Sequence, residues 1–254
     1  MRAPAHLRDM TSKVPEADSG FWLVKIAATT LGETGADALS MSLGLGYLVS
    51  TGFLAITFAI AVCAQIASKR FNPLLYWLAI VATTTIGTTI ADFADRSLGI
   101  GYAGGSVLLL VLLLASLIAW HRILGTIAID SVSTPRAETF YWITIMFSQT
   151  LGTALGDWIS DSAGLGYTGA MAIFGSMLLA VTVVWFRTRV SRTALFWIAF
   201  VLTRPLGAVV GDFLDKPVES GGLALSRFGA SAVLLALMLA VILLFPQRPA
   251  RRAH

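Results

Sequence analysis

Four aspartates in this chain lie at one repeated spacing inside apolar segments. Each follows a tryptophan by 15 residues, and the four are Asp37, Asp92, Asp157 and Asp212. An ionisable side chain within an apolar membrane segment costs free energy and is by default a functional candidate. Carboxylates suit hard cations such as Mg²⁺, Ca²⁺, Mn²⁺ and Na⁺. The spacing therefore predicts a site for a small inorganic cation or a proton, with these four residues as its candidate metal ligands.

Further polar side chains share the helical face of each aspartate, at positions four, seven and eight residues before it. In the first copy Glu33 adds a fifth carboxylate, which we assign to the cation site. The residues predicted to line the path to the site are Thr30, Thr85, Thr88, Thr150, Thr153, Gln149 and Arg204. The threonine hydroxyls could instead bond to carbonyls of their own helices. Arg204 either neutralises an aspartate or holds the helices together.

The ends of these segments carry additional charged and aromatic residues. Asp95, Asp161 and Asp215 follow the repeated aspartates. We expect them at an outer mouth, either as the rim of an acidic funnel or as interfacial residues that reach water. The tryptophans are expected to anchor the opposite membrane interface, and Lys25 to extend its ammonium to that surface. Fifteen helical residues at ~1.5 Å each separate the two levels by about 22 Å.

Composition identifies the class of protein and limits its cofactors. Of 254 residues, 56% are hydrophobic and only 13% are charged, against about 25% charged in a soluble domain. This composition predicts a polytopic membrane protein. Cys63 is the only cysteine, and the three histidines lie in polar flanks. Neither a disulfide framework nor a haem, zinc or copper site is therefore expected, and we predict no cofactor.

Eight apolar segments have about the ~20 residues needed to cross a bilayer. We predict helices over residues 21–41, 47–67, 73–95, 102–120, 139–160, 167–186, 194–214 and 224–245. Consecutive helices form four repeats, each with a short connection that is rich in glycine in three of them. The predicted fold is therefore an all-α bundle of eight transmembrane helices in four parallel two-helix repeats.

The repeats alternate in kind. Copies one and three have Ser three residues after the aspartate, whereas copies two and four have a second Asp there, followed by Arg or Lys. This ABAB pattern predicts two pseudo-twofold halves, residues 21–122 and 139–246, related by an axis along the membrane normal. A cytoplasmic segment (1–20), a link (123–138) and a basic tail (247–254) complete the chain.

Lysine and arginine predict the orientation. Fourteen of them lie on the side of the termini and inter-repeat links, and three lie on the other side. By the positive-inside rule both termini are cytoplasmic, in what we expect to be a bacterial inner membrane. The same bias explains the sequence pI of about 9.5, so we expect the lipid bilayer, but no nucleic acid, as a partner. The sequence leaves open whether copies of the chain form a homo-oligomer.

Small residues four apart occur in the first helix of every repeat, beside the aspartate face. Gly32 and Ala36 form the first such pair, and Gly152 and Gly156 the third. Small residues at this spacing allow helix backbones to approach closely. We therefore predict that the first helices pack centrally with their aspartates facing a shared interior. The second helices, which consist largely of Leu, Val and Ala, are predicted to face lipid.

The four two-helix repeats, each with its tryptophan, resemble a family of bacterial membrane proteins defined by such repeats. That family is generally described as being of unknown function. The resemblance extends over nearly the whole chain and implies eight helices. It implies no activity.

Three classes of function remain open at the level of sequence. We favour a secondary transporter of a small hard cation, with Mn²⁺ a plausible substrate, and we do not expect an enzyme. An intramembrane aspartyl protease would need Gly-x-Gly-Asp, but Ala154 stands at the first position before Asp157. The alternatives are a cation channel with a pseudo-fourfold pore, which Arg204 on the lining face disfavours, and a non-transporting scaffold or sensor.

Overall fold

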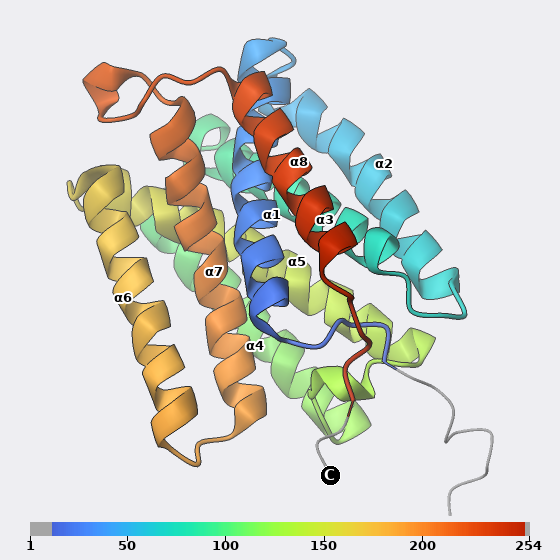
Figure 1. Ribbon diagram of the computed structural model, residues 1–254. Coiled ribbons are helices and arrows are strands. Elements are labelled where there is room, and N and C mark those ends of the chain that lie inside the picture. The colour runs from blue at the N-terminus through green and yellow to red at the C-terminus, as the bar shows by residue number, and fades with distance from the viewer. Residues whose placement is uncertain (1–11, 252–254) are drawn as a thin grey trace, which may run out of the picture.

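A computed structural model describes residues 12–251, and the regular structure in this range is helical apart from one β-bridge between Pro15 and Pro249 (Figure 1). The eight long helices are α1 (Ser19–Asp37), α2 (Gly46–Ala67), α3 (Pro73–Asp92), α4 (Tyr102–Leu124), α5 (Pro135–Asp157), α6 (Gly166–Arg187), α7 (Arg192–Asp215) and α8 (Arg227–Leu244). Short helical turns occur at η4 (Ile129–Ser131) and η6 (Val218–Ser220). The number of helices agrees with the sequence prediction.

The first helix of every repeat begins at a polar side chain that caps it. The side chains of Asp18, Asn72, Thr134 and Ser191 each accept a hydrogen bond from the backbone N–H three residues later. These residue types are preferred at this position because they satisfy an N–H that the helix leaves free. The cap explains why α5 begins at Pro135 rather than at the predicted residue 139, since proline is favoured directly after a cap.

Three of these helices end at their repeated aspartate. Asp37, Asp92 and Asp157 are each followed by a five-residue π-helical turn, namely η2 (Ala38–Ser42), η3 (Phe93–Ser97) and η5 (Trp158–Ser162). Such turns are rare and occur often at functional sites. In the fourth copy α7 continues as an α-helix past Asp212 to Asp215.

The first helices of the repeats form the centre of the molecule. α1 and α5 each pack against both α3 and α7, so these four inner helices close into a ring. The second helices form an outer layer in which α2 covers α3, α4 covers α5, α6 covers α7 and α8 covers α1. Figure 1 shows α8 lying along α1 and α6 along α7. Each outer helix therefore covers the inner helix of the next repeat, and α8 completes the circle.

Glycines set the spacing of the inner ring. A Cβ on Gly32 would overlap Thr84 of α3, one on Gly152 would overlap Arg204 of α7, and one on Gly207 would overlap Thr29 of α1. At the same position in α3, a Cβ on Gly87 would lie 3.1 Å from backbone atoms of Gln149 and Thr150. All four glycines lie five residues before the repeated aspartate, so one close approach recurs around the ring.

This packing predicts opposite effects for two glycine substitutions. Gly207→Ala should lower the free energy of unfolding by about 1–3 kcal/mol, since the methyl group would overlap the Thr29 side chain and backbone. Gly175→Ala, in open space on α6, should raise it by up to about 1 kcal/mol because alanine favours helix. Thermal unfolding of the purified protein in detergent measures both. Equal effects would contradict the close approach.

The outer surface is apolar, as a membrane protein requires. Six helices are long and apolar enough to cross a membrane: α2, α3 with its following turn, α4, α6, α7 and α8. The two others, α1 and α5, belong to the buried ring, where polar residues are covered by neighbouring helices. These features support a multi-pass membrane protein.

Both ends of the described chain lie at one end of the bundle. The Ala250 N–H donates to the Val14 carbonyl at 2.8 Å, and the Lys13 N–H donates to Val132 in the α4–α5 link at 2.9 Å. Lys13 also forms an ion pair with Glu138 at 2.6 Å. We call this end of the bundle the terminus-bearing end, and the repeated aspartates lie at the opposite end of the inner helices.

Candidate functional site

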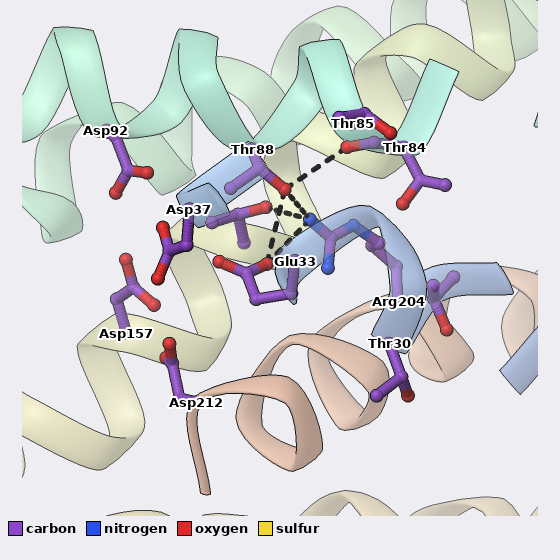
Figure 2. A network of polar contacts seen from close by, with 12 residues as sticks. Thr30, Glu33, Asp37, Thr84, Thr85, Thr88, Asp92, Asp157, Arg204 and Asp212 are labelled. Atoms are coloured by element: carbon purple, nitrogen blue, oxygen red, sulfur yellow. Dashed lines mark hydrogen bonds and ion pairs between the residues drawn. The ribbon is translucent and has the colours of Figure 1, made fainter. Parts of the chain in front are cut away.

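The four repeated aspartates are buried at the ends of the inner helices. Their exposed fractions are only 1–3%. Figure 2 shows Asp37, Asp92, Asp157 and Asp212 with their carboxylates directed toward a common centre, and Glu33 beside them. Asp215, 7% exposed, joins the same group through shared ion-pair partners. We call these six residues the acidic site.

Two groups within the acidic site have the spacing of metal ligands. One carboxylate oxygen from each of Glu33, Asp37 and Asp92 lies within 4.8 Å of the others, and the same holds for Asp37, Asp212 and Asp215. Oxygen ligands bind Ca²⁺ at about 2.3–2.6 Å and Mg²⁺ at about 2.0–2.1 Å. The first group could therefore surround one ion after small side-chain movements, whereas the second could do so only if Lys216 moved away. Asp37 belongs to both groups, whereas Asp157 belongs to neither.

Three cationic side chains cover the acidic site at the end remote from the termini. Lys216 forms ion pairs with Asp37 and with Asp212, the latter at 3.0 Å. Arg96 Nε lies 3.0 Å from Asp92, and Arg227 Nε lies 2.9 Å from Asp215. The three side chains are 12–33% exposed, whereas the carboxylates beneath them are almost fully buried. We call Arg96, Lys216 and Arg227 the cationic cover.

Lys216 is held in its charged form. Burial of its ammonium lowers the pKa, but the surrounding carboxylates, Asp212 first, outweigh burial, so that the pKa of Lys216 is raised above its usual value. Lys216 therefore remains a cation at any physiological pH. It occupies the space between Asp37 and Asp212 that a bound metal ion would need.

Sequence reasoning missed the cationic cover as part of the site. Arg96 and Lys216 follow Asp92 and Asp212 by four residues, a spacing at which helical side chains meet. That spacing was the available signal. Arg227 begins α8, 12 residues after Asp215, with which it pairs across the α7–α8 link. Its second partner, Asp37, is far away in sequence, and the packing of α8 on α1 brings the two together.

Arg204 is paired with Glu33 rather than with a repeated aspartate. Its Nη2 lies 2.9 Å from Glu33 Oε2 and also donates to the hydroxyls of Thr88 and Thr153. The Thr88 hydroxyl donates to the same Glu33 oxygen at 3.2 Å. Figure 2 shows this network between Arg204, Glu33 and Thr88, next to the aspartates. Both members of the ion pair are buried, so the pair links α7 to α1 in the interior.

The other predicted lining residues divide into two kinds. The hydroxyls of Thr30, Thr85 and Thr150 donate to carbonyls four residues earlier, at 3.0, 2.6 and 3.0 Å. These are the bonds within the same helix that the sequence left open as an alternative to lining a path. Because each hydroxyl has donated its one proton, it can only accept a further hydrogen bond. Gln149, by contrast, is fully buried with no hydrogen-bond partner for either amide atom. Such an atom pair is a place for ordered water.

The three residues expected at an outer mouth do not share one environment. Asp161 is exposed and Asp95 is half-buried. Asp215 is buried in the acidic site, contrary to the prediction, because Lys216 and Arg227 lie between it and the outside. The outer rim is thus made of cations as well as carboxylates.

Aromatic side chains close the interior at the terminus-bearing end. Trp77, Trp142 and Trp197 are only 2–4% exposed, so the prediction that they anchor at the interface is wrong for these three; Trp22 is partly exposed. Tyr76 and Tyr141 share a hydrogen bond of 2.6 Å between their hydroxyls. The buried aromatic residues at this end form what we call the aromatic layer: Trp77, Trp142, Trp197, Tyr76, Tyr141, Phe21, Phe196 and Phe200.

Lys25 lies on the inner side of this layer. It is fully buried, with its Nζ 4.2 Å from the centre of the Phe200 ring. The sequence expectation that Lys25 reaches the membrane surface is therefore wrong. A cation over an aromatic face is attracted by the ring quadrupole, which offsets part of the cost of its burial.

The repeats seen in the sequence and the structure correspond to a known family. A family model described as a Repeat of Unknown Function (DUF347) matches residues 20–71, 75–126, 140–191 and 195–247. The chain belongs to this repeat family. No curated protein and no solved structure matches the chain.

Each matched repeat comprises one inner and one outer helix, and so contributes one aspartate to the acidic site. The fourth copy differs at the level below the aspartates. Four residues before the repeated aspartate, the other copies have Glu33, Thr88 and Thr153, whereas the fourth copy has Ala208. Arg204, one helical turn before Ala208, extends toward Glu33 and pairs with it. One repeat thus supplies the cation for the carboxylate of another.

Proposed function

We propose that this protein is an integral membrane transporter of a small hard cation, bound at the acidic site. The observation that carries the proposal is an imbalance of buried charge. Six buried carboxylates form the acidic site, while four cations contact them, namely Arg96, Arg204, Lys216 and Arg227. Uncompensated charge is costly in a membrane interior. Two protons or one divalent cation would remove the excess.

This charge excess suggests how transport could be driven. Exchange of one divalent cation for two protons leaves the total charge of the site unchanged, so neither loaded form carries an unpaired buried charge. Mn²⁺ is our preferred substrate, since the site offers oxygen ligands only and lacks imidazole and thiolate. Na⁺, exchanged for one proton, is the monovalent alternative.

The two closed ends support alternating access over a permanent pore. The aromatic layer closes the end that bears the termini, which we propose is cytoplasmic, and the cationic cover shields the other end. We propose that the two ABAB halves, which are related by an axis along the membrane normal, rock against one another in a bacterial inner membrane. An arriving metal ion takes the place of Lys216 between Asp37 and Asp212.

Proteoliposomes that contain the purified protein test this proposal. We expect saturable, pH-coupled uptake in a panel of Mn²⁺, Mg²⁺, Ca²⁺ and Na⁺, with at least a tenfold loss in Asp37→Asn because Asp37 serves both ligand groups. Asp157→Asn should lose less, since Asp157 belongs to neither group. Asp130→Asn, at a half-buried aspartate in the α4–α5 link at the opposite end of the bundle, is the matched control and should transport as the wild type does.

Three outcomes decide between the alternatives. Uptake that is the same with and without the protein for every cation would defeat the transport proposal. Ohmic single-channel current would replace it with a channel. If exchange of all four repeated aspartates for asparagine left a cellular phenotype intact, the scaffold or sensor would stand in its place.

A further inference from the structure

An apolar groove on the lipid-facing side of the bundle is independent of the acidic site. It has a volume of about 470 Å³ and lies between α1 and α6, with α7 as its floor. Trp22 and Ile26 form one wall, and Val181 and Trp185 form the other. This volume falls within the roughly 300–1,000 Å³ of small-molecule sites. The groove is large enough for a ligand, and its walls are apolar.

The groove has the height of one membrane leaflet. Its floor runs along α7 from Leu195 to Thr203, which at ~1.5 Å per residue is about 12 Å. Half of a ~30 Å hydrocarbon core is about 15 Å. The lower end of the groove coincides with the start of α7 at the terminus-bearing end, where a lipid headgroup would lie. The dimensions therefore fit a lipid acyl chain.

Positive charge is concentrated at the headgroup end. Arg192 lies 4.5 Å from the Trp185 ring and donates to the Trp185 carbonyl, so it is attached to a residue that lines the groove. Arg187 ends α6, and Arg189 follows in the same link. All three arginines are exposed. Asp18, the acidic residue in the lining of the groove, is engaged as the cap of α1 through the Phe21 N–H.

A related but smaller groove occurs at the equivalent position of the duplicated structure, again between helices from both halves. It lies between α2 and α5, with a volume of about 310 Å³, and its lining includes Trp142 and Met146, the counterparts of Trp22 and Ile26 in repeat three. Here Phe58 and Val62 stand where the larger groove has Leu178 and Thr182. The duplication thus supplies two grooves, of which the one beside the arginines is the wider.

We infer that the groove between α1 and α6 binds an anionic phospholipid. One acyl chain lies along α7 between Trp22 and Trp185, and Arg187, Arg189 and Arg192 hold the phosphate headgroup. The inference goes beyond the proposed transport and does not depend on it. Basic residues near a membrane surface attract anionic lipid. The apolar walls of the groove add contacts with the acyl chain, which charged surface residues alone would not provide.

Nanodiscs with equal amounts of phosphatidylglycerol and phosphatidylcholine test the inference. After the protein is released, native mass spectrometry should find phosphatidylglycerol retained over phosphatidylcholine. The double variant Arg187→Gln/Arg192→Gln should reduce this preference about fivefold per arginine, since each basic residue near the surface contributes about 1 kcal/mol. Arg122→Gln, an exposed arginine at the end of α4, is the matched control.

A substitution in the floor of the groove tests the acyl chain separately. Ala199→Phe should abolish retention of this lipid, whereas Leu179→Phe, on α6 but outside the lining, should not. A further measurement needs only the wild-type protein. Added phosphatidylglycerol should raise its thermal stability more than added phosphatidylcholine does. Equal retention of the two lipids by the wild type, or an unchanged preference in the double arginine variant, would overturn the inference.

Discussion

Replacing Arg204 by methionine should lower the free energy of unfolding by about 3–5 kcal/mol, because it leaves Glu33 charged and buried without its partner. The guanidinium is fully buried and also donates to the hydroxyls of Thr88 and Thr153. Its loss therefore removes contacts from α7 to α1, α3 and α5 at once. Unfolding by heat or by SDS in detergent micelles measures the change.

A second substitution should restore most of this loss. In the double variant Arg204→Met/Glu33→Gln neither member of this ion pair is left charged without the other, and removing both members of a buried pair is often nearly neutral. Arg136→Met, at an exposed arginine near the start of α5, is the matched control and should stay within about 0.5 kcal/mol of the wild type. If the double variant were as unstable as the single variant, the ion pair would not be the cause.

Replacing Lys216 by methionine should raise the affinity of the acidic site for Mn²⁺ by at least tenfold. Lys216 lies between Asp37 and Asp212 and repels any cation that approaches them. At an effective dielectric constant of ~20, two unit charges about 4 Å apart interact by about 4 kcal/mol, so a tenfold change is a cautious expectation. Titration with Mn²⁺, followed by calorimetry or electron paramagnetic resonance, measures the affinity.

The same variant should transport poorly although it binds well. A site that holds its ion more tightly releases it more slowly, so turnover in proteoliposomes is expected to fall as affinity rises. Lys69→Met, an exposed lysine in the α2–α3 link, controls for loss of a lysine elsewhere. A lower affinity for Mn²⁺ in Lys216→Met would show that Lys216 supports the site and does not compete for it.

Much of the fold followed from the sequence because its causes are local. Eight apolar segments of membrane-spanning length and the fixed distance from Trp to Asp predict eight helices in four repeats, as found. The placement of the first helices at the centre also followed, since Gly32, Gly152 and their counterparts need close neighbours. Local pattern and packing agree at these positions.

The features that were missed depend on contacts between distant segments. The sequences of the leucine-rich outer helices do not indicate which inner helix each one covers. The packing of α8 on α1 was therefore not predictable. The ion pair of Arg227 with Asp37 was missed for the same reason. Lys25 and Trp77 were assigned to the membrane interface from their positions near the helix ends, whereas the structure buries both inside the ring.

The order in which the outer helices cover the ring has a consequence for biosynthesis. Of the eight long helices in residues 12–251, α1 is synthesised first, but α8, the helix that covers it, is synthesised last. Until α8 arrives, the side of α1 that bears Thr34 lacks its final partner, Ser231, and Arg227 cannot reach Asp37. The nascent chain must therefore hold its first carboxylates in the membrane while the other seven helices are made. The last helix to insert also delivers one of the cations that close the acidic site.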